Sequence, residues 1–209
     1  MDVAFVLYPN MTALDLVGPY ETLSGHPDVT PLFVAARVGK ITCDSGMGLH
    51  ADEAFADVTA PDMIVVPGSS HWRSALDDRE LTDWIAAVHP RTSWTTSVCT
   101  GSTLLAKAGV LTGRPATTHW MAREVLGELG AVVSTDRVVI DGNVITAAGV
   151  SAGIDMGLTL AATLWGRETA QLIQLAIEYD PQPPFDAGSP DTAPPEIVAA
   201  ARAVMGGQG

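Results

Sequence analysis

Residues 92–102 read TSWTTSVCTGS. The β-branched and aromatic residues up to Val98 are typical of a strand, and the following residues 100–108 place two leucines and Ala108 on one face of a helix. Cys99 stands where the strand meets the helix, in a turn of small residues. Hydrolases place a nucleophilic serine at such a junction, so the pattern predicts a nucleophile elbow built on a cysteine.

The remainder of the chain alternates between short apolar segments and amphipathic ones. Strands are predicted at residues 2–8, 32–37, 63–66, 131–135 and 138–147, the last with a tight turn at Asp141-Gly142. Helices are predicted at residues 79–88, 121–129, 152–165 and 168–179. This alternation predicts an α/β fold in which a mostly parallel sheet lies between two layers of helices, a three-layer sandwich.

Two segments near the amino terminus are less regular. Pro19 fits the first turn of a helix that ends near Gly25, which leaves Asp15 on the turn before that helix. Residues 41–50 are rich in glycine and are predicted to form an extended excursion without a helix.

The carboxyl-terminal segment has a different composition. Residues 180–195 contain six prolines among sixteen residues, so they are predicted to form an extended surface arm. A short helix is predicted at residues 196–205. A single domain over residues 1–209 is expected, because one hydrophobic core suits a chain of this length.

The composition argues against several classes of protein. The chain has 24 acidic and 11 basic residues, a formal charge of −13, which disfavours binding to nucleic acid. No apolar run approaches the roughly 20 residues of a membrane helix, and the amino terminus lacks the pattern of a secretory signal, so a cytoplasmic location is expected. In a reducing compartment Cys43 and Cys99 are expected to be free thiols, with Cys43 inert either in packing or on the surface.

The chemistry is expected where the strands end. In open parallel sheets, ligands bind at the carboxyl ends of the strands. Cys99 is the candidate nucleophile there, and the carboxylate of Asp15 follows the first strand. The backbone amides of Gly68 and Ser69 could form an oxyanion-type hole, and the imidazole of His119 could orient or neutralise a nearby group.

Each candidate also has a plainer interpretation. Cys99 could be a small buried residue, Asp15 a solvated helix cap and His119 a packing residue. A thiol at a helix amino terminus is expected to have a lowered pKa, whereas a nearby Asp15 would raise the pKa of the thiol while sharing its proton. The remaining histidines have no metal-ligand spacing, so no metal is predicted.

Four passages carry a resemblance to a known family: LDLVGP at 14–19, SVCTGS at 97–102, ATTHW at 116–120 and AGID at 152–155. With the proline-rich tail, EYDPQPPFDAGSP at 178–190, the chain resembles the ThiJ/PfpI superfamily over essentially its whole length, and most closely the isonitrile hydratase branch. The resemblance implies a flavodoxin-like sandwich, a homodimer and no cofactor. It also implies that Cys99 is the nucleophile, that Asp15 donates and accepts protons, and that Thr100 supplies a neighbouring hydroxyl and amide.

Three departures from relatives narrow this expectation. Transcriptional regulators with a similar amino-terminal domain append a DNA-binding region of roughly a hundred residues, and the present sequence ends at Gly209, so DNA binding is not expected. Protease-like relatives place a histidine directly after the cysteine, where Thr100 stands here. Related proteins often have two glycines where this chain has Gly68-Ser69, so a left-handed peptide there would be strained or would aim its amide differently.

The branch implies the hydration of isonitriles to N-substituted formamides through a covalent thioimidate on Cys99. Two rival functions use the same thiol: a glyoxalase-like conversion of reactive dicarbonyls, and a redox sensor whose cysteine oxidises without turnover. The sequence leaves the natural substrate open.

Overall fold

The central sheet has seven strands. The computed structural model describes residues 1–206, and its strands follow the order β10-β11-β7-β6-β1-β2-β5. All neighbouring pairs are parallel except β10 and β11, which form the predicted hairpin. The bounds are β1 Asp2–Val6, β2 Thr30–Ala35, β5 Glu53–Ala54, β6 Met63–Val66, β7 Trp94–Val98, β10 Val138–Asp141 and β11 Val144–Ala147. The predicted mostly parallel sheet is confirmed.

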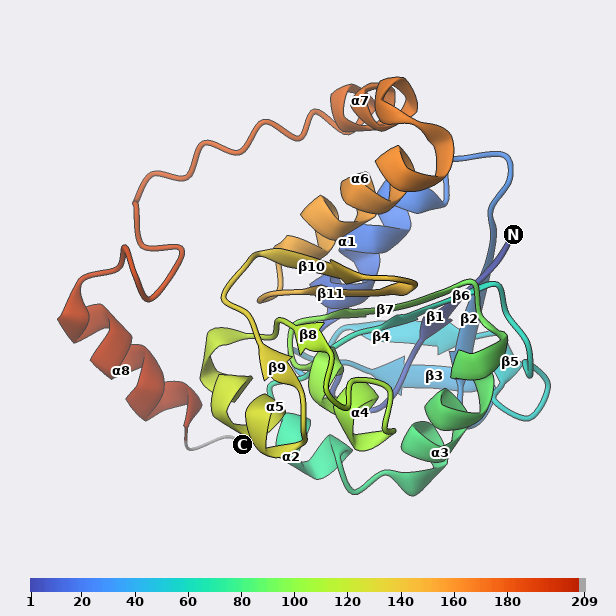
Figure 1. Ribbon diagram of the computed structural model, residues 1–209, viewed down its shortest axis with the longest axis horizontal. Coiled ribbons are helices and arrows are strands. Elements are labelled where there is room, and N and C mark those ends of the chain that lie inside the picture. The colour runs from blue at the N-terminus through green and yellow to red at the C-terminus, as the bar shows by residue number, and fades with distance from the viewer. Residues whose placement is uncertain (207–209) are drawn as a thin grey trace.

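Helices cover both faces of this sheet (Figure 1). One face carries α1 Ala13–Leu23 and α6 Ala152–Trp165, and α7 Arg167–Ala176 packs against α6 farther from the sheet. The other carries α2 Trp72–Ala75, α3 Arg79–Val88, α4 Gly101–Lys107 and α5 Arg123–Glu128, with short 3₁₀ turns at His89–Arg91 and Trp120–Ala122. The architecture is therefore the predicted three-layer, flavodoxin-like sandwich. Of the helices in residues 1–206, none has the length and apolar character that crossing a bilayer demands.

The core lies on both faces of the middle strands. Val3–Val6 of β1 and Met63–Val66 of β6 are completely inaccessible to solvent, as expected for parallel strands that are covered on two sides. The register also aligns the strand ends, because Val66 pairs with Ser97 of β7 and Val98 pairs with Ala147 of β11. The residues that follow β6, β7 and β11 consequently meet at one edge of the sheet.

The start of α1 differs from the prediction. The helix begins at Ala13, so Asp15 lies in its first turn rather than on a preceding loop, and Pro19 lies inside the helix. Pro19 packs against α6, where a Cβ on Gly153 would lie 3.0 Å from Pro19 Cδ. The proline removes one backbone donor, and close packing between α1 and α6 holds the helix together despite that loss.

Two small sheets complete the fold. Residues 41–50, predicted to be an extended excursion, form most of an antiparallel hairpin of β3 Gly39–Thr42 and β4 Gly48–Ala51. The Asp44 amide at the tip of this hairpin donates to the carbonyl of Met11 at 3.0 Å, which brings the tip beside α1. Cys43 is buried in the core. The second small sheet pairs β8 Pro115–Ala116 with β9 Val132–Val133.

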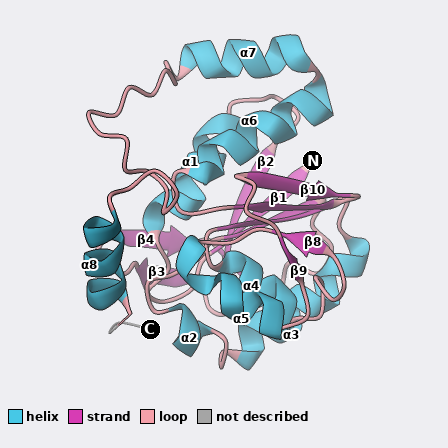
Figure 2. Ribbon diagram, turned by 60° about the vertical axis from the view of Figure 1, so that its left-hand side comes forward, coloured by secondary structure: helices cyan, strands magenta, loops and turns pink. Residues whose placement is uncertain are grey.

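An extended segment leads from α7 to the terminal helix. Residues 177–194 contain no helix or strand and swing away from the sandwich before α8 Pro195–Met205 returns beside it (Figures 1 and 2). The guanidinium of Arg202 on α8 lies 5.1 Å from the centre of a ring of Trp120. This cation–π contact connects α8 to the loop that also carries His119.

Gly101 provides a test of the packing around the first turn of α4. A Cβ at this position would overlap the carbonyl oxygen of Val66, which is fixed in β6. We expect Gly101→Ala to lower the free energy of unfolding by about 1–3 kcal/mol or more in urea denaturation. Gly25→Ala is the matched control, because nothing lies within 4 Å of that position, and its effect should stay within about 0.5 kcal/mol. Equal effects of the two substitutions would contradict this account.

Candidate active site

Cys99 occupies the predicted elbow between β7 and α4. Its backbone has φ of 57°, a left-handed conformation that non-glycine residues adopt rarely and at a cost of about 1–3 kcal/mol. The Cys99 amide donates to the carbonyls of Ala147 and Ala148 at 3.1 and 2.8 Å, which fixes the turn against β11. The side chain is almost fully buried, with 5% of its surface exposed.

Asp15 reaches this elbow from the first turn of α1. Its Oδ2 accepts a hydrogen bond of 2.8 Å from the amide of Gly68, and none of the residue is exposed to solvent. The carboxyl also interacts with the Cys99 thiol. A Cβ on Gly68 would lie 2.9 Å from Asp15 Oδ2 and 2.5 Å from the nitrogen of Thr100, so only glycine permits this close arrangement.

The amides after β6 do not form the predicted oxyanion-type hole. The Gly68 amide is used by Asp15, and the Ser69 amide donates to Thr100 Oγ1 at 2.9 Å. Thr100 Oγ1 in turn donates to the carbonyl of Ser69 at 3.2 Å. That prediction is wrong because both N–H groups are already paired inside the protein. Ser69 also has no positive φ, so the strain considered for a serine at this position is absent.

Two other amides face the Cys99 sulfur. Backbone hydrogen bonding from Val150 and Thr100 favours the thiolate. The family resemblance implied a role for the Thr100 amide, whereas Val150 was not predicted. It lies in the turn between β11 and α6, and the alignment of β11 with β7 is the signal that could have located it.

Burial dominates the protonation of the central pair. Desolvation, followed by the charge of Asp15, raises the pKa of the Cys99 thiol well above its usual range, and the two amides offset only part of that rise. The predicted lowering of this pKa is therefore wrong for the free protein. Desolvation also raises the pKa of Asp15 from 3.8 to about 7, although the Gly68 amide opposes it. The resting pair near neutral pH is a thiol beside a carboxyl that is close to half-protonated.

His119 lies at the rim of the site and is partly buried. Its Nδ1 accepts a long hydrogen bond of 3.4 Å from the Met121 amide, and its ring packs against Gly149, where a Cβ would lie 2.8 Å from Cδ2. Burial and the charge of Arg123 lower the pKa of His119, so its imidazole is neutral at pH 7. The adjacent Thr118 hydroxyl donates to the Cys99 carbonyl at 3.0 Å.

The side chains around Cys99 enclose a cavity of about 210 Å³, called the catalytic cavity below. Its polar wall includes Thr12, whose hydroxyl donates to Asp44 Oδ2 at 2.6 Å. Apolar residues that were not foreseen form the other wall, and Met205 comes from the terminal helix α8. The lining residues are Thr12, Asp44, Ser69, Ser70, Trp72, Cys99, Thr100, His119, Met121, Val150 and Met205. Within residues 1–206, no three His, Cys, Asp or Glu side chains are grouped to hold a metal ion.

Comparison with known proteins identifies the family. The DJ-1/PfpI family model matches residues 1–163. The chain belongs to the DJ-1/PfpI family. An isonitrile hydratase of Pseudomonas putida is 45% identical over 202 residues, which cover 97% of this chain and 89% of that protein. A crystal structure of a ThiJ/PfpI family protein from Pseudomonas syringae is 36% identical, covers 99% of this chain and 86% of that one, and has a TM-score of 0.94.

Two further proteins are less similar to this chain. The HTH-type transcriptional regulator CdhR of Pseudomonas aeruginosa is 31% identical over 177 residues, 81% of this chain but 52% of the regulator. The structure of DJ-1beta from Drosophila melanogaster has a TM-score of 0.76 at 21% identity, which shows a shared fold.

Burial of Asp15 predicts an unusual pH dependence of stability. Its pKa is about 7 in the folded protein and 3.8 ordinarily, so between these values the folded state holds a proton that the unfolded state has released. The free energy of unfolding should therefore fall as pH rises from about 4 to about 7. Asp15→Asn should remove this fall and be more stable than the wild type at pH 8, by on the order of 2–4 kcal/mol.

Urea denaturation at several pH values provides this measurement. The matched control is Asp83→Asn, which changes an exposed aspartate on α3 and should leave the pH dependence of the wild type in place. If the free energy of unfolding of Asp15→Asn changes with pH in parallel with that of the wild type from pH 4 to 8, the pKa of Asp15 is not raised by folding.

Proposed function

We propose that this protein hydrates isonitriles, R–NC, to N-substituted formamides through a thioimidate on Cys99. The observation that carries the proposal is the buried pair of Cys99 and Asp15 at the base of a partly apolar cavity. The 45% identity to an isonitrile hydratase over nearly the whole chain supports the same reaction. The protein is proposed to act on a small molecule in the cytoplasm without binding nucleic acid, and to need no cofactor.

The first step forms the covalent bond. Ionised Asp15 takes the thiol proton as the Cys99 sulfur attacks the terminal carbon of the isonitrile. Asp15 then delivers that proton to the same carbon, which gives R–N=CH–S–Cys99. The amides of Val150 and Thr100 stabilise negative charge on the sulfur during the attack, and Thr100 Oγ1 holds the Ser69 peptide beside Asp15.

The second step consumes water. The water oxygen adds to the thioimidate carbon, and Asp15 transfers one of the water protons to the substrate nitrogen. The product of this step is R–NH–CH(OH)–S–Cys99. The carbon–sulfur bond then breaks, the hydroxyl proton returns through Asp15 to the sulfur, and R–NH–CHO leaves. The sum is R–NC + H₂O → R–NHCHO, so no oxidant or reductant takes part.

The geometry weakens the case for a redox sensor. Oxidation of the resting protein requires a thiolate, whereas burial and the charge of Asp15 raise the pKa of Cys99 and keep it a thiol. A glyoxalase-like reaction would use the same thiol and carboxyl, and no contact in the cavity favours a dicarbonyl over an isonitrile. Lactate formation from methylglyoxal is the assay that distinguishes the two.

Substitution of the two cysteines tests the proposal. Cys99→Ala should abolish formation of the formamide from an alkyl isonitrile, because no thioimidate can form. Cys43→Ala is the matched control: Cys43 is also buried but lies outside the catalytic cavity, so that variant should retain turnover. Chromatographic measurement of the formamide distinguishes these outcomes, and equal yields from wild type and Cys99→Ala would refute the mechanism.

The pH profile of kcat/KM tests the role of Asp15. Because the carboxyl must be ionised to accept the thiol proton, kcat/KM should rise with pH through about 7, the pKa of Asp15. Asp15→Asn should lose this limb and about 10²–10⁴-fold in rate. If Asp15→Asn keeps the wild-type rise of kcat/KM with pH, a group other than Asp15 causes that rise.

A homodimer is also proposed. Leu172 and Leu175 on α7 are 67% and 76% exposed, so the sandwich leaves apolar surface uncovered that a second copy could bury. Light scattering should give twice the 21.8 kDa mass of one chain, and the mass of a single chain would contradict the dimer.

A further inference from the structure

A second cavity adjoins the catalytic one. It has a volume of about 380 Å³ and shares His119 and Val150 with the catalytic cavity, so these two residues stand between the spaces. Its outer wall is formed by residues 188–191 of the proline-rich segment. A molecule bound at Cys99 could therefore extend past His119 towards this second space.

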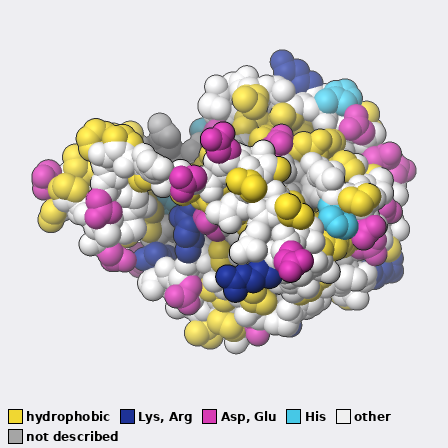
Figure 3. Space-filling model, turned by 90° about the horizontal axis from the view of Figure 1, so that it is seen from above, with side chains coloured by type: hydrophobic (Ala, Val, Ile, Leu, Met, Phe, Trp, Pro, Cys, Tyr) yellow, Lys and Arg dark blue, Asp and Glu magenta, His cyan; other side chains and the backbone are white. Residues whose placement is uncertain are grey.

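The second cavity concentrates positive charge in an acidic protein. Only 11 of the 35 charged residues are basic, yet Arg123 and Arg137 both line it. Trp120 also lines this cavity, and the guanidinium of Arg202 lies over the Trp120 ring. Figure 3 shows Lys and Arg atoms in the hollow between the lobe of the terminal segment and the rest of the molecule. Two arginines and one aspartate, Asp191, thus line this cavity, whereas acidic residues outnumber basic ones in the whole chain.

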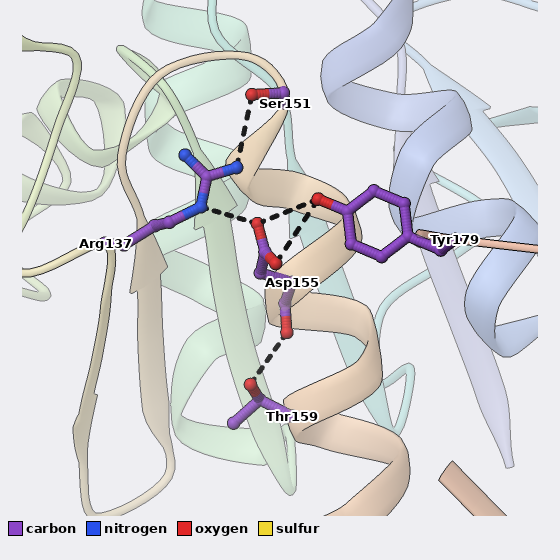
Figure 4. Close-up of polar contacts among 5 residues, drawn as sticks. All are labelled: Arg137, Ser151, Asp155, Thr159 and Tyr179. Atoms are coloured by element: carbon purple, nitrogen blue, oxygen red, sulfur yellow. Dashed lines mark hydrogen bonds and ion pairs between the residues drawn. The ribbon is translucent and has the colours of Figure 1, made fainter. Parts of the chain in front are cut away.

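The two arginines differ in their partners. Arg137 is held by α6, because its Nε lies 2.6 Å from Asp155 Oδ2 and its Nη2 donates to Ser151 Oγ at 3.2 Å (Figure 4). Tyr179 approaches the same carboxylate at 3.4 Å. The charge of Arg137 is largely neutralised by this network.

Arg123 lacks such a partner. Within residues 1–206 it forms no ion pair with an acidic side chain, and its Nε is buried without a hydrogen bond. A buried donor that is left unpaired costs roughly 1–3 kcal/mol, so an acceptor supplied from outside would be favoured there. Asp191 also lines the cavity, but it is exposed and lies beyond ion-pair distance of Arg123.

We propose that the second cavity binds a carboxylate on the substituent of the substrate, with Arg123 as its partner. This inference rests on the proposed function, because it places the isonitrile carbon at Cys99 and the acidic group beyond His119. The planar guanidinium suits a carboxylate through paired N–H donors, and the neutral His119 between the cavities adds no competing charge. The favoured substrates are isonitriles whose chain ends in a carboxylate.

Kinetics with matched substrates test this assignment. A series of ω-isocyano carboxylates of increasing chain length is compared with the methyl ester of each. The wild type should favour the carboxylate over its ester at one chain length. Arg123→Gln should raise KM for that carboxylate at least about 10-fold, while kcat for the carboxylate and KM for the ester should change little. Arg123→Lys should recover part of the preference.

Arg167→Gln is the matched control, since Arg167 is exposed on α7 and lines neither cavity. A wild type without preference for the carboxylate, or equal effects of Arg123→Gln and Arg167→Gln, would overturn the inference. Hydration of the esters by the wild type reports on the proposed function by itself.

A binding measurement keeps the inference testable without turnover. The matching N-formyl ω-amino carboxylate, the product of the reaction, should bind the wild type in calorimetry. It should bind Arg123→Gln at least about 10-fold more weakly, whereas the Arg167→Gln affinity should equal that of the wild type. Equal binding to all three proteins would refute the carboxylate site even if every isonitrile in the series is hydrated.

Discussion

Removal of water from the Asp15 carboxyl and the Cys99 thiol is the constraint on which the site depends. Both groups prefer to be neutral when they are buried. The charge of Asp15 makes ionisation of the thiol more costly, whereas the thiol hydrogen bond lowers the pKa of Asp15 and offsets only part of the effect of burial. The pair therefore keeps a proton near neutral pH that an exposed aspartate would have released. In the proposed reaction the sulfur attacks the isonitrile carbon and the thiol proton is then delivered to that same carbon, so a proton shared by the nucleophile and the carboxyl serves both steps.

The fold brings together the chain segments that hold this pair. Parallel strands with aligned ends bring three chain reversals to one edge of the sheet, and each reversal supplies one element of the site. The turn after β7 presents the sulfur, the turn after β6 fixes the carboxyl through Gly68, and the turn after β11 adds the Val150 amide. The turn with the left-handed φ of Cys99 is fixed against β11 by the hydrogen bonds from the Cys99 amide to Ala147 and Ala148, and Gly101 packs closely against β6.

Much of this could be predicted from the sequence, because the periodicity of strands and helices is local. The elbow and the approach of Asp15 to Cys99 were predicted from the ends of the strands, and the place of Thr100 beside them from the family resemblance. The predicted start of α1 was wrong, because tight packing against α6 lets Pro19 lie inside the helix. The predicted lowering of the Cys99 pKa was wrong. The start of a helix can be recognised locally in the sequence, whereas the burial of the thiol depends on every element packed around Cys99. The roles of the Gly68 and Ser69 amides, and of Val150, depend on distances that no single segment encodes.

Titration of the Asp15 carboxyl is the most direct test of the central claim. The ¹³C NMR signal of that carboxyl, identified by its absence from Asp15→Asn, should report an apparent pKa of about 7 in the wild type. In Cys99→Ala the apparent pKa should rise further, because the thiol no longer stabilises the ionised carboxyl. An apparent pKa near the ordinary 3.8 of an aspartate, unchanged by loss of the thiol, would contradict the shared proton.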